Sequence, residues 1–470
     1  MSIYNLDLTT FQQEFNTSKA DRLEYGEIYT PFSLINKMLD LFDPTTFLDA
    51  TKRWLDIGAG QGYFSLLVFE RLNKGLVSAI PTEMERKKHI IEKMLYMVEL
   101  KDSNVLALKA LFGTGANIIH TDFCLAFAFE GSLAFEGFDI ILGNPPYNAH
   151  GMKKAPTNHL SQKKQDGQTI WTHFIQKSLT LLKPVTGQLC VIIPSLWLKP
   201  DKAQMHEQLT QYKIEKMHCL SGNETNAIFK GAAQTPTCFF LLTKTIISTI
   251  ERIISLYDYR RQQYVNFKHQ LGQPIPIFGA HIIQKIQPYI KLAGGESIKV
   301  YKTNMPPINS KFSDANVVAY PYINITTCLL NNCQPILSLN YSNIPQAFHG
   351  VKKLVLAHKM HGFPYFDRQG TYGIANRDNY VILDKTDAEF AQLQAFLSTK
   401  FTLYIFEAAR YRMKYLEKYA FQFLPDITRL PGFPLAEHIN EDSVATFFGL
   451  DEIDKQYISG LHRKEYKRFI

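Results

Sequence analysis

The chain is poor in the features that mark secreted and membrane proteins. Its 470 residues include six cysteines, and none of them form a CxxC pair, which argues against a disulfide framework and a structural zinc site. The N-terminus MSIYNLDLTTFQQEF has no basic segment followed by an apolar one. No uninterrupted apolar run approaches the roughly 20 residues that cross a bilayer. We therefore expect a soluble protein of a reducing cytoplasm, neither secreted nor inserted in a membrane.

Several other patterns are missing as well. We find no internal repeat and no low-complexity tract. The histidines between residues 349 and 361 have no acidic residues at the spacing of metal ligands, so the sequence predicts no metal site. No constellation of the PD-(D/E)xK type can be placed, and we expect no nuclease activity in this chain.

What the chain does contain is a large apolar fraction with a modest excess of positive charge. A hydrophobic content of 46% is enough to bury a large core, and the length favours more than one domain. The formal net charge of +8 favours a polyanionic partner but does not by itself identify one.

Short apolar runs alternate with helix-period segments over the first half of the chain. This alternation predicts parallel strands joined by crossover helices, and hence a doubly wound α/β sheet of seven strands in a domain spanning residues 1–245. Residues 246–470 form a second, α+β domain in this interpretation, beginning with a helical stretch and containing a later helix capped by Thr386. The predicted strands are residues 53–57, 76–80, 116–120, 138–142, 187–193, 213–220 and 237–242.

A glycine-rich turn follows the first predicted strand. The segment LDIGAGQGYF places Gly58, Gly60 and Gly62 between a strand and a helix, where glycines allow a tight turn and close approach of a ligand to backbone N–H groups. A tight βα connection without a ligand fits these residues equally well.

Acidic residues follow three predicted strands. Asp56 ends the first, Glu83 lies 21 positions after Gly62 at the end of the second, and Asp122 follows the third, with Phe123 beside it. Ligands of open α/β sheets bind at the carboxyl ends of the strands, and an acid at the position of Glu83 can accept both hydroxyls of a ribose. The alternative for each acid is a solvated loop carboxylate.

A capped helix is predicted upstream of the sheet. In EIYTPFSLINKMLDLF, Thr30 has the properties of an N-cap and Pro31 those of a first helical residue. The apolar positions that follow predict a helix packed on the sheet. Its N-terminal end could meet a ligand carboxylate, or could simply be an ordinary capped helix end.

The stretch GNPPYN ends the fourth predicted strand on two prolines, which stop both helices and ladders. Asn144 offers a side-chain acceptor and Pro145 a backbone carbonyl, so the two can converge on one NH2 group and leave its lone pair free to attack an electrophile. Pro146 stiffens the turn, and Tyr147 offers a flat surface on which a base can stack. A rigid turn with a packed tyrosine is the alternative.

The capped segment, the glycine turn, the acids and the Asn-Pro-Pro-Tyr turn follow one another in that order along the chain. In this order residues 25 to 245 resemble the gamma class of S-adenosylmethionine-dependent DNA amino-methyltransferases of restriction-modification systems. The resemblance implies a catalytic turn at Asn144 to Tyr147 and S-adenosylmethionine as the cofactor. It implies that Tyr29, Thr30 and Pro31 hold the methionine part of the cofactor, and that the cofactor loop contains Asp56, Gly58, Gly60 and Gly62. In the same resemblance Glu83 holds the ribose, and Asp122 and Phe123 form the site of the cofactor adenine.

The same resemblance implies the substrate. Asn-Pro-Pro-Tyr is associated in that family with the N6 amine of adenine, which must leave the duplex stack to reach the site. Phe229 lies where the family has a residue that presses on the flipped base, although a core aromatic would also fit there. The C-terminal domain would recognise the target in double-stranded DNA. We expect a monomer, with any restriction endonuclease on a separate chain.

Basic residues in two regions are candidates for DNA contacts, since Arg and Lys hold phosphates and read guanine edges. A solvated basic face is the alternative. The candidates are Lys153, Lys154, Lys163 and Lys164 in the polar segment after the Asn-Pro-Pro-Tyr turn, and Lys359, Arg368, Arg410 and Arg412 in the C-terminal domain.

Two further functions remain open from the sequence. Methyltransferases that modify a glutamine of release factors carry the same four-residue turn on the same fold, but they lack so long a C-terminal region. A catalytically silent DNA-binding homologue could also keep the fold, although the intact turn and acids argue against decay.

Overall fold

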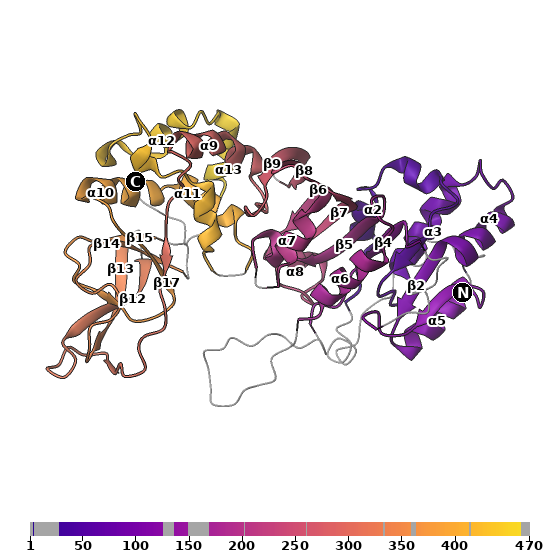
Figure 1. Ribbon diagram of the computed structural model, residues 1–470, viewed down its shortest axis with the longest axis horizontal. Coiled ribbons are helices and arrows are strands. Elements are labelled where there is room, and N and C mark those ends of the chain that lie inside the picture. Colours follow the sequence, from indigo (N-terminus) through magenta and orange to yellow (C-terminus); the bar gives the residue numbers. More distant parts are fainter. Residues whose placement is uncertain are drawn as a thin grey trace. The chain divides into compact units, whose positions relative to one another are not determined.

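The computed structural model describes residue 3 and residues 28–125, 136–148, 169–201, 203–259, 261–331, 334–358, 363–412 and 415–461 (Figure 1). The chain divides into two compact units, Met1–Tyr257 with His269–Gly272, and Asp258–Lys268 with Gln273–Ile470. The first unit thus extends about a dozen residues beyond the predicted boundary at 245, because the sheet continues past that point. Among the described residues, no helix is long and apolar enough to cross a membrane, and no group of acidic, histidine and cysteine side chains could hold a metal ion.

One mixed sheet has the strand order β3-β2-β1-β4-β5-β7-β6-β8-β9. Strands β1 to β7 and nearly all of β8 belong to the first unit, whereas most of β9 falls in the residues of the second. Strands β1 to β5 pair in parallel, and β7 runs antiparallel between β5 and β6. The sheet has nine strands in the described residues rather than the seven predicted. They are β1 Trp54–Asp56, β2 Leu95–Glu99, β3 Asn117–His120, β4 Ile140–Gly143, β5 Gln188–Pro194, β6 Tyr212–Leu220, β7 Thr237–Ile246, β8 Glu251–Asp258 and β9 Gln263–Gln270.

Side chains are buried on both faces of the central strands. Ile140 and Leu142 of β4 belong to one large core cluster with helices on one face, whereas Phe240 of β7 packs on Trp197 on the other face, with ring centroids 5.0 Å apart. Burial on both faces is typical of parallel strands that are covered by helices. The helices of this unit are α2 Phe32–Leu39, α3 Tyr63–Gly75, α4 Glu83–His89, α5 Asp102–Phe112, α6 Trp171–Leu181, α7 Met205–Thr210 and α8 Gly222–Ile228.

Two predictions of secondary structure are wrong. Residues 76–80 are not a strand: Leu76 caps α3, the amide of Ile80 donates to its carbonyl, and Val77 is half exposed. The second strand is β2 instead. Residues 251–270, predicted as helix, form β8 and β9, and burial along β8 alternates with the period of two that a half-buried strand requires. These two strands account for the larger sheet.

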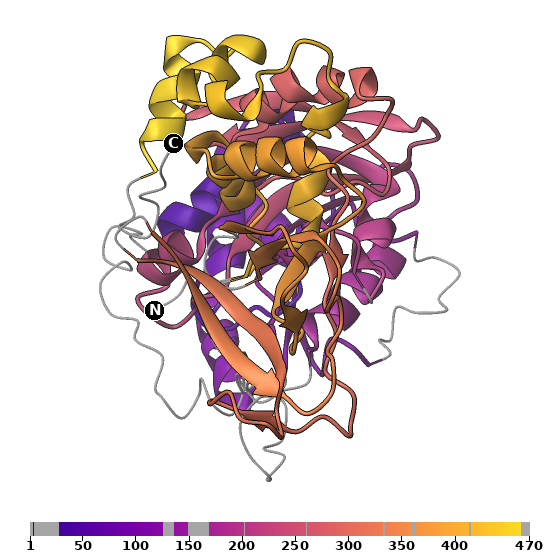
Figure 2. The same ribbon diagram turned by 90° about the vertical axis from the view of Figure 1, so that its left-hand side faces the viewer.

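The second unit combines two small sheets with helices (Figures 1 and 2). Their orders are β10-β17-β14-β15 and β11-β13-β12-β16, and in the second of them β12 and β13 form a long antiparallel pair. The elements are α9 Ala280–Leu292, β10 Tyr301–Lys302, β11 Phe312–Ser313, β12 Tyr322–Asn331, β13 Gln334–Ser342, β14 Lys353–Ala357, β15 Pro364–Asp367, β16 Gly373–Ile374, β17 Asn379–Ile382, α10 Asp387–Leu397, α11 Lys400–Ala408, α12 Glu441–Phe447 and α13 Glu452–Ser459.

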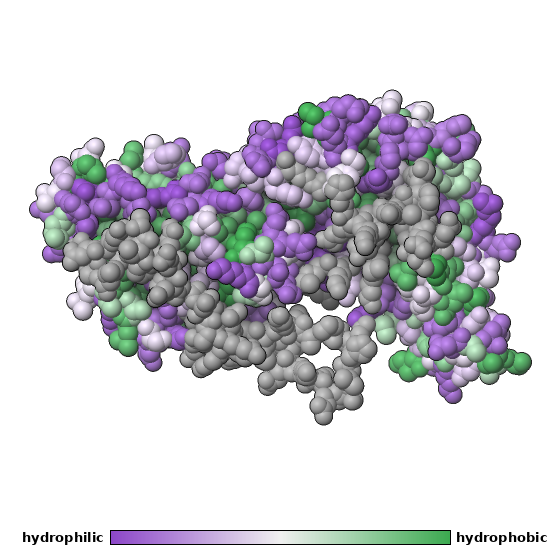
Figure 3. Space-filling view, turned by 180° about the vertical axis from the view of Figure 1, so that it is seen from behind, coloured by the Kyte–Doolittle hydropathy of each residue, from purple (hydrophilic) through white to green (hydrophobic). Residues whose placement is uncertain are grey.

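Helix α10 begins where the sequence predicts. The Thr386 hydroxyl accepts from the amide of Glu389, whose carboxylate accepts from the amide of Thr386, so both halves of the capping box are present. The coloured part of the surface in Figure 3 is mostly hydrophilic with smaller hydrophobic areas, and exposed apolar side chains are normal on protein surfaces.

A buried ion pair stabilises the β14 sheet. The side chains of Lys353 and Asp367 are 0% and 2% exposed and their charged atoms lie 2.6 Å apart. The Lys353 ammonium also donates to three backbone carbonyls, and Asp367 accepts from the amides of Thr371 and Tyr372. Lys353 is therefore a structural residue and not part of a basic surface.

Replacing Asp367 with alanine should destabilise the protein by about 3–5 kcal/mol, because it leaves a buried ammonium without its counter-ion. Urea unfolding measures the loss. The control is Lys352→Ala, which removes an exposed pair with Asp387 and should change the free energy of unfolding by less than about 1 kcal/mol. Equal effects of the two variants would contradict the assignment.

Candidate active site

The Asn-Pro-Pro-Tyr turn begins where β4 ends, beside the end of β1. Asp56, the last residue of β1, pairs with Leu142 of β4. Gly143, the last residue of β4, therefore lies beside the end of β1. Gly143 has a φ of 145°, and a Cβ at this position would lie 3.0 Å from the Ile57 side chain, so a glycine is required here. The next residue, Asn144, therefore stands at the carboxyl edge of the sheet.

The side-chain amide of Asn144 is held by the segment that precedes α2. Its Nδ2 donates to the Thr30 hydroxyl at 3.1 Å, and the Ile28 carbonyl lies 3.5 Å from the same nitrogen. The predicted N-cap is therefore wrong by one residue: Pro31 occupies the cap position and accepts from the amide of Leu34 at 2.9 Å. The Thr30 hydroxyl does not cap α2 but accepts the hydrogen bond from Asn144.

Tyr147 is packed behind the turn. Its hydroxyl is buried and has no hydrogen-bond partner among the described residues. Burial raises the pKa of this phenol well above its usual range, and the nearby Cys238 thiol acts in the same direction. The Tyr147 carbonyl accepts from the amide of Ile170 at 3.1 Å, and Asn148 pairs with Thr169, so residues that flank the segment 149–168 meet next to the turn.

The glycine turn has the tight geometry that the sequence predicts. Gly62 caps α3 in the left-handed conformation, and a Cβ there would lie 2.8 Å from Leu108 and 2.9 Å from Phe112. Gly60 also has a positive φ, of 54°. By contrast, a Cβ on Gly58 would meet nothing within 4 Å. The backbone therefore faces open space at Gly58, where a ligand could approach it.

Glu99, which sequence reasoning misses, is the acid that faces this turn. It ends β2 and is 9% exposed. One carboxylate oxygen accepts from the amide of Gly60 at 2.7 Å, and the other accepts from the amides of Leu100 and Lys101 at 3.0 and 2.8 Å. Its position at the end of the strand next to β1 is the one that the sequence spacing assigns to Glu83.

Glu83 lies elsewhere, which corrects the sequence-based prediction. It opens α4 rather than ending a strand. Its side chain is 64% exposed and pairs with Lys87 one turn later at 2.7 Å. The interval from the glycine turn to the second acid is longer than the spacing suggests, because α4 and a π-helical turn, Ile90–Met94, come before β2.

Asp56 is a buried acid at the end of β1. Its Oδ2 accepts from the Ser65 hydroxyl at 2.9 Å, while Oδ1 has no hydrogen-bond partner in the part of the chain that the structure describes. Burial raises the pKa of Asp56 to about 7; the hydrogen bond from Ser65 opposes this shift and the negative charge of Glu99 adds to it.

This pKa predicts an unusual dependence of stability on pH. Between the usual aspartate pKa of 3.8 and about 7, the folded protein keeps a proton on Asp56 that the unfolded chain releases. The contribution of Asp56 to the free energy of unfolding is therefore fully present below pH 4 and is lost as the pH rises through 7. Asp56→Asn should abolish this fall in the free energy of unfolding with rising pH, a fall of at most a few kcal/mol. Urea midpoints of both proteins at pH 5 and 7.5 measure it, and parallel shifts would contradict the assignment.

The third acid and its aromatic neighbour lie near their expected places. Asp122 follows β3, and its Oδ1 accepts from the amide of Cys124 at 2.8 Å. Phe123 is 3% exposed and stacks on Phe174 of α6, with ring centroids 5.2 Å apart. Phe229 is 5% exposed and belongs to the core cluster, the environment expected of a core aromatic rather than of an open base clamp.

Some of the buried polar atoms without hydrogen-bond partners in the described residues lie at the carboxyl end of the sheet. Unsatisfied buried atoms are rare in proteins and often indicate an absent water or ligand. The sequence offers no signal for Ser195 and Asn226, because a lone Ser or Asn forms no pattern. Those at this edge, within the described residues, are Asp56 Oδ1, Tyr147 OH, Ser195 Oγ and Asn226 Oδ1.

The candidate DNA contacts have mixed outcomes. Arg368 is exposed and lies over the Phe366 ring, 5.3 Å from its centroid. Arg412 is 53% exposed, 3.4 Å from Glu417. Arg410 is only 13% exposed and pairs with Glu407, so it is not available to DNA in this conformation. The other candidates fall outside the described residues: Lys153, Lys154, Lys163, Lys164 and Lys359.

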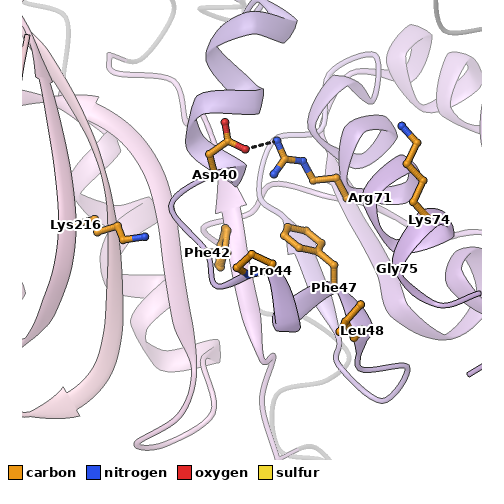
Figure 4. Close-up of a pocket in the computed structure, with 9 residues that line it drawn as sticks. All are labelled: Asp40, Phe42, Pro44, Phe47, Leu48, Arg71, Lys74, Gly75 and Lys216. Atoms are coloured by element: carbon orange, nitrogen blue, oxygen red, sulfur yellow. Dashed lines mark hydrogen bonds and ion pairs between the residues drawn. The ribbon is translucent and has the colours of Figure 1, made fainter. Parts of the chain in front are cut away.

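A separate cavity of about 530 Å³ lies beyond the other end of α3 (Figure 4). Its basic side chains already have partners in the protein: Arg71 donates to Asp40 at 2.7 Å, Lys216 donates to the Leu41 carbonyl at 3.1 Å, and Lys74 pairs with Glu70. The Phe47 ring contributes an apolar wall. This cavity is remote from the glycine turn, which begins α3, and is not part of the candidate active site.

A largely parallel sheet with a glycine turn after β1 and an acid at the end of β2 gives the first unit a mixed α/β fold. Residues 16–226 match the Eco57I restriction-modification methylase family. This match agrees with the resemblance to restriction-modification methyltransferases that the motifs indicate.

Three known proteins are similar to this chain in sequence or in fold. An uncharacterized adenine-specific methylase of Mycoplasma pneumoniae is 34% identical over 96 residues, which cover 20% of this chain and 23% of that protein. The Type IIL restriction-modification enzyme MmeI, solved in complex with DNA, is similar in fold with a TM-score of 0.53 and 11% identity, over 95% of this chain and 78% of MmeI. A modification subunit of a putative type I restriction enzyme from Vibrio vulnificus aligns with a TM-score of 0.37 and 15% identity, over 58% of this chain and 54% of that one.

Proposed function

We propose that this protein is a site-specific DNA methyltransferase that transfers a methyl group from S-adenosylmethionine to the N6 amine of a flipped-out adenine in double-stranded DNA. The observation that carries the proposal is the Asn144 amide, held at the carboxyl edge of the sheet next to the glycine turn by Thr30. The match of residues 16–226 to a restriction-modification methylase family supports the reaction class.

The residues around the glycine turn suit S-adenosylmethionine. When bound, this cofactor supplies an electrophilic methyl group on a sulfonium. Open space at Gly58 and the unpartnered Oδ1 of Asp56 leave room and polarity for a ligand. We assign Glu99, in place of Glu83, to the ribose hydroxyls, and Asp122 to the adenine of the cofactor. Tyr29 and Pro31 would border the methionine part, whereas the Thr30 hydroxyl is directed at Asn144.

The catalytic turn would act by positioning. Oδ1 of Asn144 and the Pro145 carbonyl would each accept a hydrogen bond from one N–H of the adenine amine. These two contacts favour a tetrahedral nitrogen with its lone pair directed at the electrophile. The methylated amine would lose its extra proton to water, so no strong base is needed for this step. Tyr147 supports the base, whereas Phe229 would have to leave the core cluster to clamp it, so we assign Phe229 to packing.

The C-terminal region would recognise the target sequence. We assign catalysis to residues 1–245, extended to Tyr257 by the boundary of the first compact unit, and DNA recognition to the remainder. Arg368 and Arg412 are the described candidates that remain exposed. The protein would act as a cytoplasmic monomer, and any partner endonuclease would be a separate chain.

Transfer of a tritiated methyl group tests the proposal. Purified protein should label duplex DNA in the presence of tritiated S-adenosylmethionine and should leave a release factor unlabelled. Labelling of the release factor alone would support glutamine methylation instead. Binding of DNA without labelling of either substrate would identify a silent homologue. Sequencing of DNA from expressing cells by a method that detects modified bases would then give the recognition site.

A further inference from the structure

We propose that Thr30 is a positioning residue that, together with the Ile28 carbonyl, holds the Asn144 amide with Nδ2 toward the protein and Oδ1 toward the substrate amine. This inference rests on the proposed function. It assigns to Thr30 a role in the methyl-transfer step that differs from contact with the cofactor and from capping of α2.

The contact is well defined. The Thr30 side chain is 4% exposed, and its hydroxyl oxygen lies 3.1 Å from Nδ2 of Asn144. The Ile28 carbonyl approaches the same nitrogen at 3.5 Å. Both groups come from one short segment that joins α2, and the Pro31 carbonyl anchors that segment by accepting from the amides of Leu34 and Ile35 at 2.9 and 3.0 Å.

The orientation of this amide matters because its two ends are nearly equal in shape but opposite in chemistry. A half-turn about the last side-chain bond exchanges the oxygen acceptor with the NH2 donor at almost no steric cost. The adenine amine is itself a donor, so the half-turned amide would place donor against donor. The correct orientation presents Oδ1 to the substrate and Nδ2 to the protein.

Thr30 and Ile28 favour the productive orientation together. The Ile28 carbonyl can only accept a hydrogen bond, so it favours Nδ2 over Oδ1. The Thr30 hydroxyl could bond either end of the amide, so its closer contact holds the side chain in place where the Ile28 carbonyl selects the orientation. Since α2 is packed by four buried apolar side chains, the pair of acceptors is fixed to the core of the domain rather than to a free loop.

Thr30→Val is the direct test, because valine keeps the shape of threonine and removes the acceptor. We expect kcat for DNA methylation to fall about tenfold or more through misorientation of Asn144, while KM for S-adenosylmethionine changes less than about twofold, as a loss confined to the transition state requires. Thr30→Ser, which keeps the hydroxyl, should recover most of kcat.

Thr210→Val is a matched control for loss of a buried threonine hydroxyl. Thr210 is 1% exposed and donates to the His206 carbonyl in α7, away from the catalytic turn. Its variant should show a stability loss of similar size with kcat within about twofold of wild type. A raised KM for S-adenosylmethionine with unchanged kcat in Thr30→Val would overturn the inference and make Thr30 a cofactor contact.

A second background tests whether Thr30 acts through Asn144. In Asn144→Asp the two carboxylate oxygens are equivalent, so no orientation remains to be selected. Adding Thr30→Val to this variant should then lower kcat by less than about threefold, and an undiminished tenfold loss would overturn the inference. Failure of wild type to methylate DNA would reject the proposed function, whereas a fully active wild type with a fully active Thr30→Val would reject this inference alone.

Discussion

Replacing Asn144 with alanine should reduce methyl transfer to DNA by about a thousandfold or more. The variant loses the side-chain acceptor that orients the substrate amine, and removal of one preorganised polar group from a transition state costs on the order of 10² to 10³ in rate, to which loss of alignment adds. Initial rates with tritiated S-adenosylmethionine measure the effect. The affinity for the cofactor, measured by calorimetry, should stay within about threefold, because the loss lies in the transition state.

Asn73→Ala provides a comparison within the same domain. The Asn73 amide accepts from Arg86 at 2.9 Å near the end of α3, far along the helix from the glycine turn. This variant also loses a hydrogen-bonded amide, but its rate of methylation should remain near that of wild type. Full activity of Asn144→Ala would rule out the mechanism.

Replacing Glu99 with glutamine should weaken binding of S-adenosylmethionine by about 10- to 100-fold. A hydrogen bond to a charged acceptor contributes about 1.5–3 kcal/mol, and the Glu99 carboxylate both faces the glycine turn and holds the amide of Gly60. Glutamine keeps the shape and one acceptor, so the fold should persist. Calorimetric titration of the cofactor measures the change.

The matched variant is Glu83→Gln. Glu83 is the acid that sequence spacing favours, yet its side chain is solvent-exposed and paired with Lys87. Its replacement should leave cofactor affinity within about twofold of wild type. The two variants thus separate the two assignments, and the reverse order of effects would show that the position of Glu99 has no bearing on the cofactor.

Much of the first unit could be predicted from apolar runs. Strands β1 and β3 to β7 lie within a few residues of the predicted ranges, because buried strands need continuous apolar residues. The sequence does not reveal β2, because LYMVE follows a run of helix formers and fits a continuation of the helix. It does not reveal β8 and β9, because their charged residues alternate with apolar ones over a stretch that also fits a helical period.

The candidate site was predictable where chemistry constrains the backbone. Gly62 and Gly143 occupy positions that a Cβ would block, and the prolines of the turn can only end a strand. The sequence could not place Glu99, since its distance from the turn depends on an inserted helix. It also could not reveal that Arg410 is neutralised by Glu407 or that Thr30 bonds to Asn144, because such pairings exist only after the chain has folded.

The central claim is that Asn144 presents an adenine amine for methylation. The most direct measurement is mass spectrometry of nucleosides from duplex DNA that has been incubated with the protein and S-adenosylmethionine. The account predicts N6-methyldeoxyadenosine with wild type and none with Asn144→Ala. Methylated cytosine as the product, or equal amounts of methylated adenine with both proteins, would contradict it.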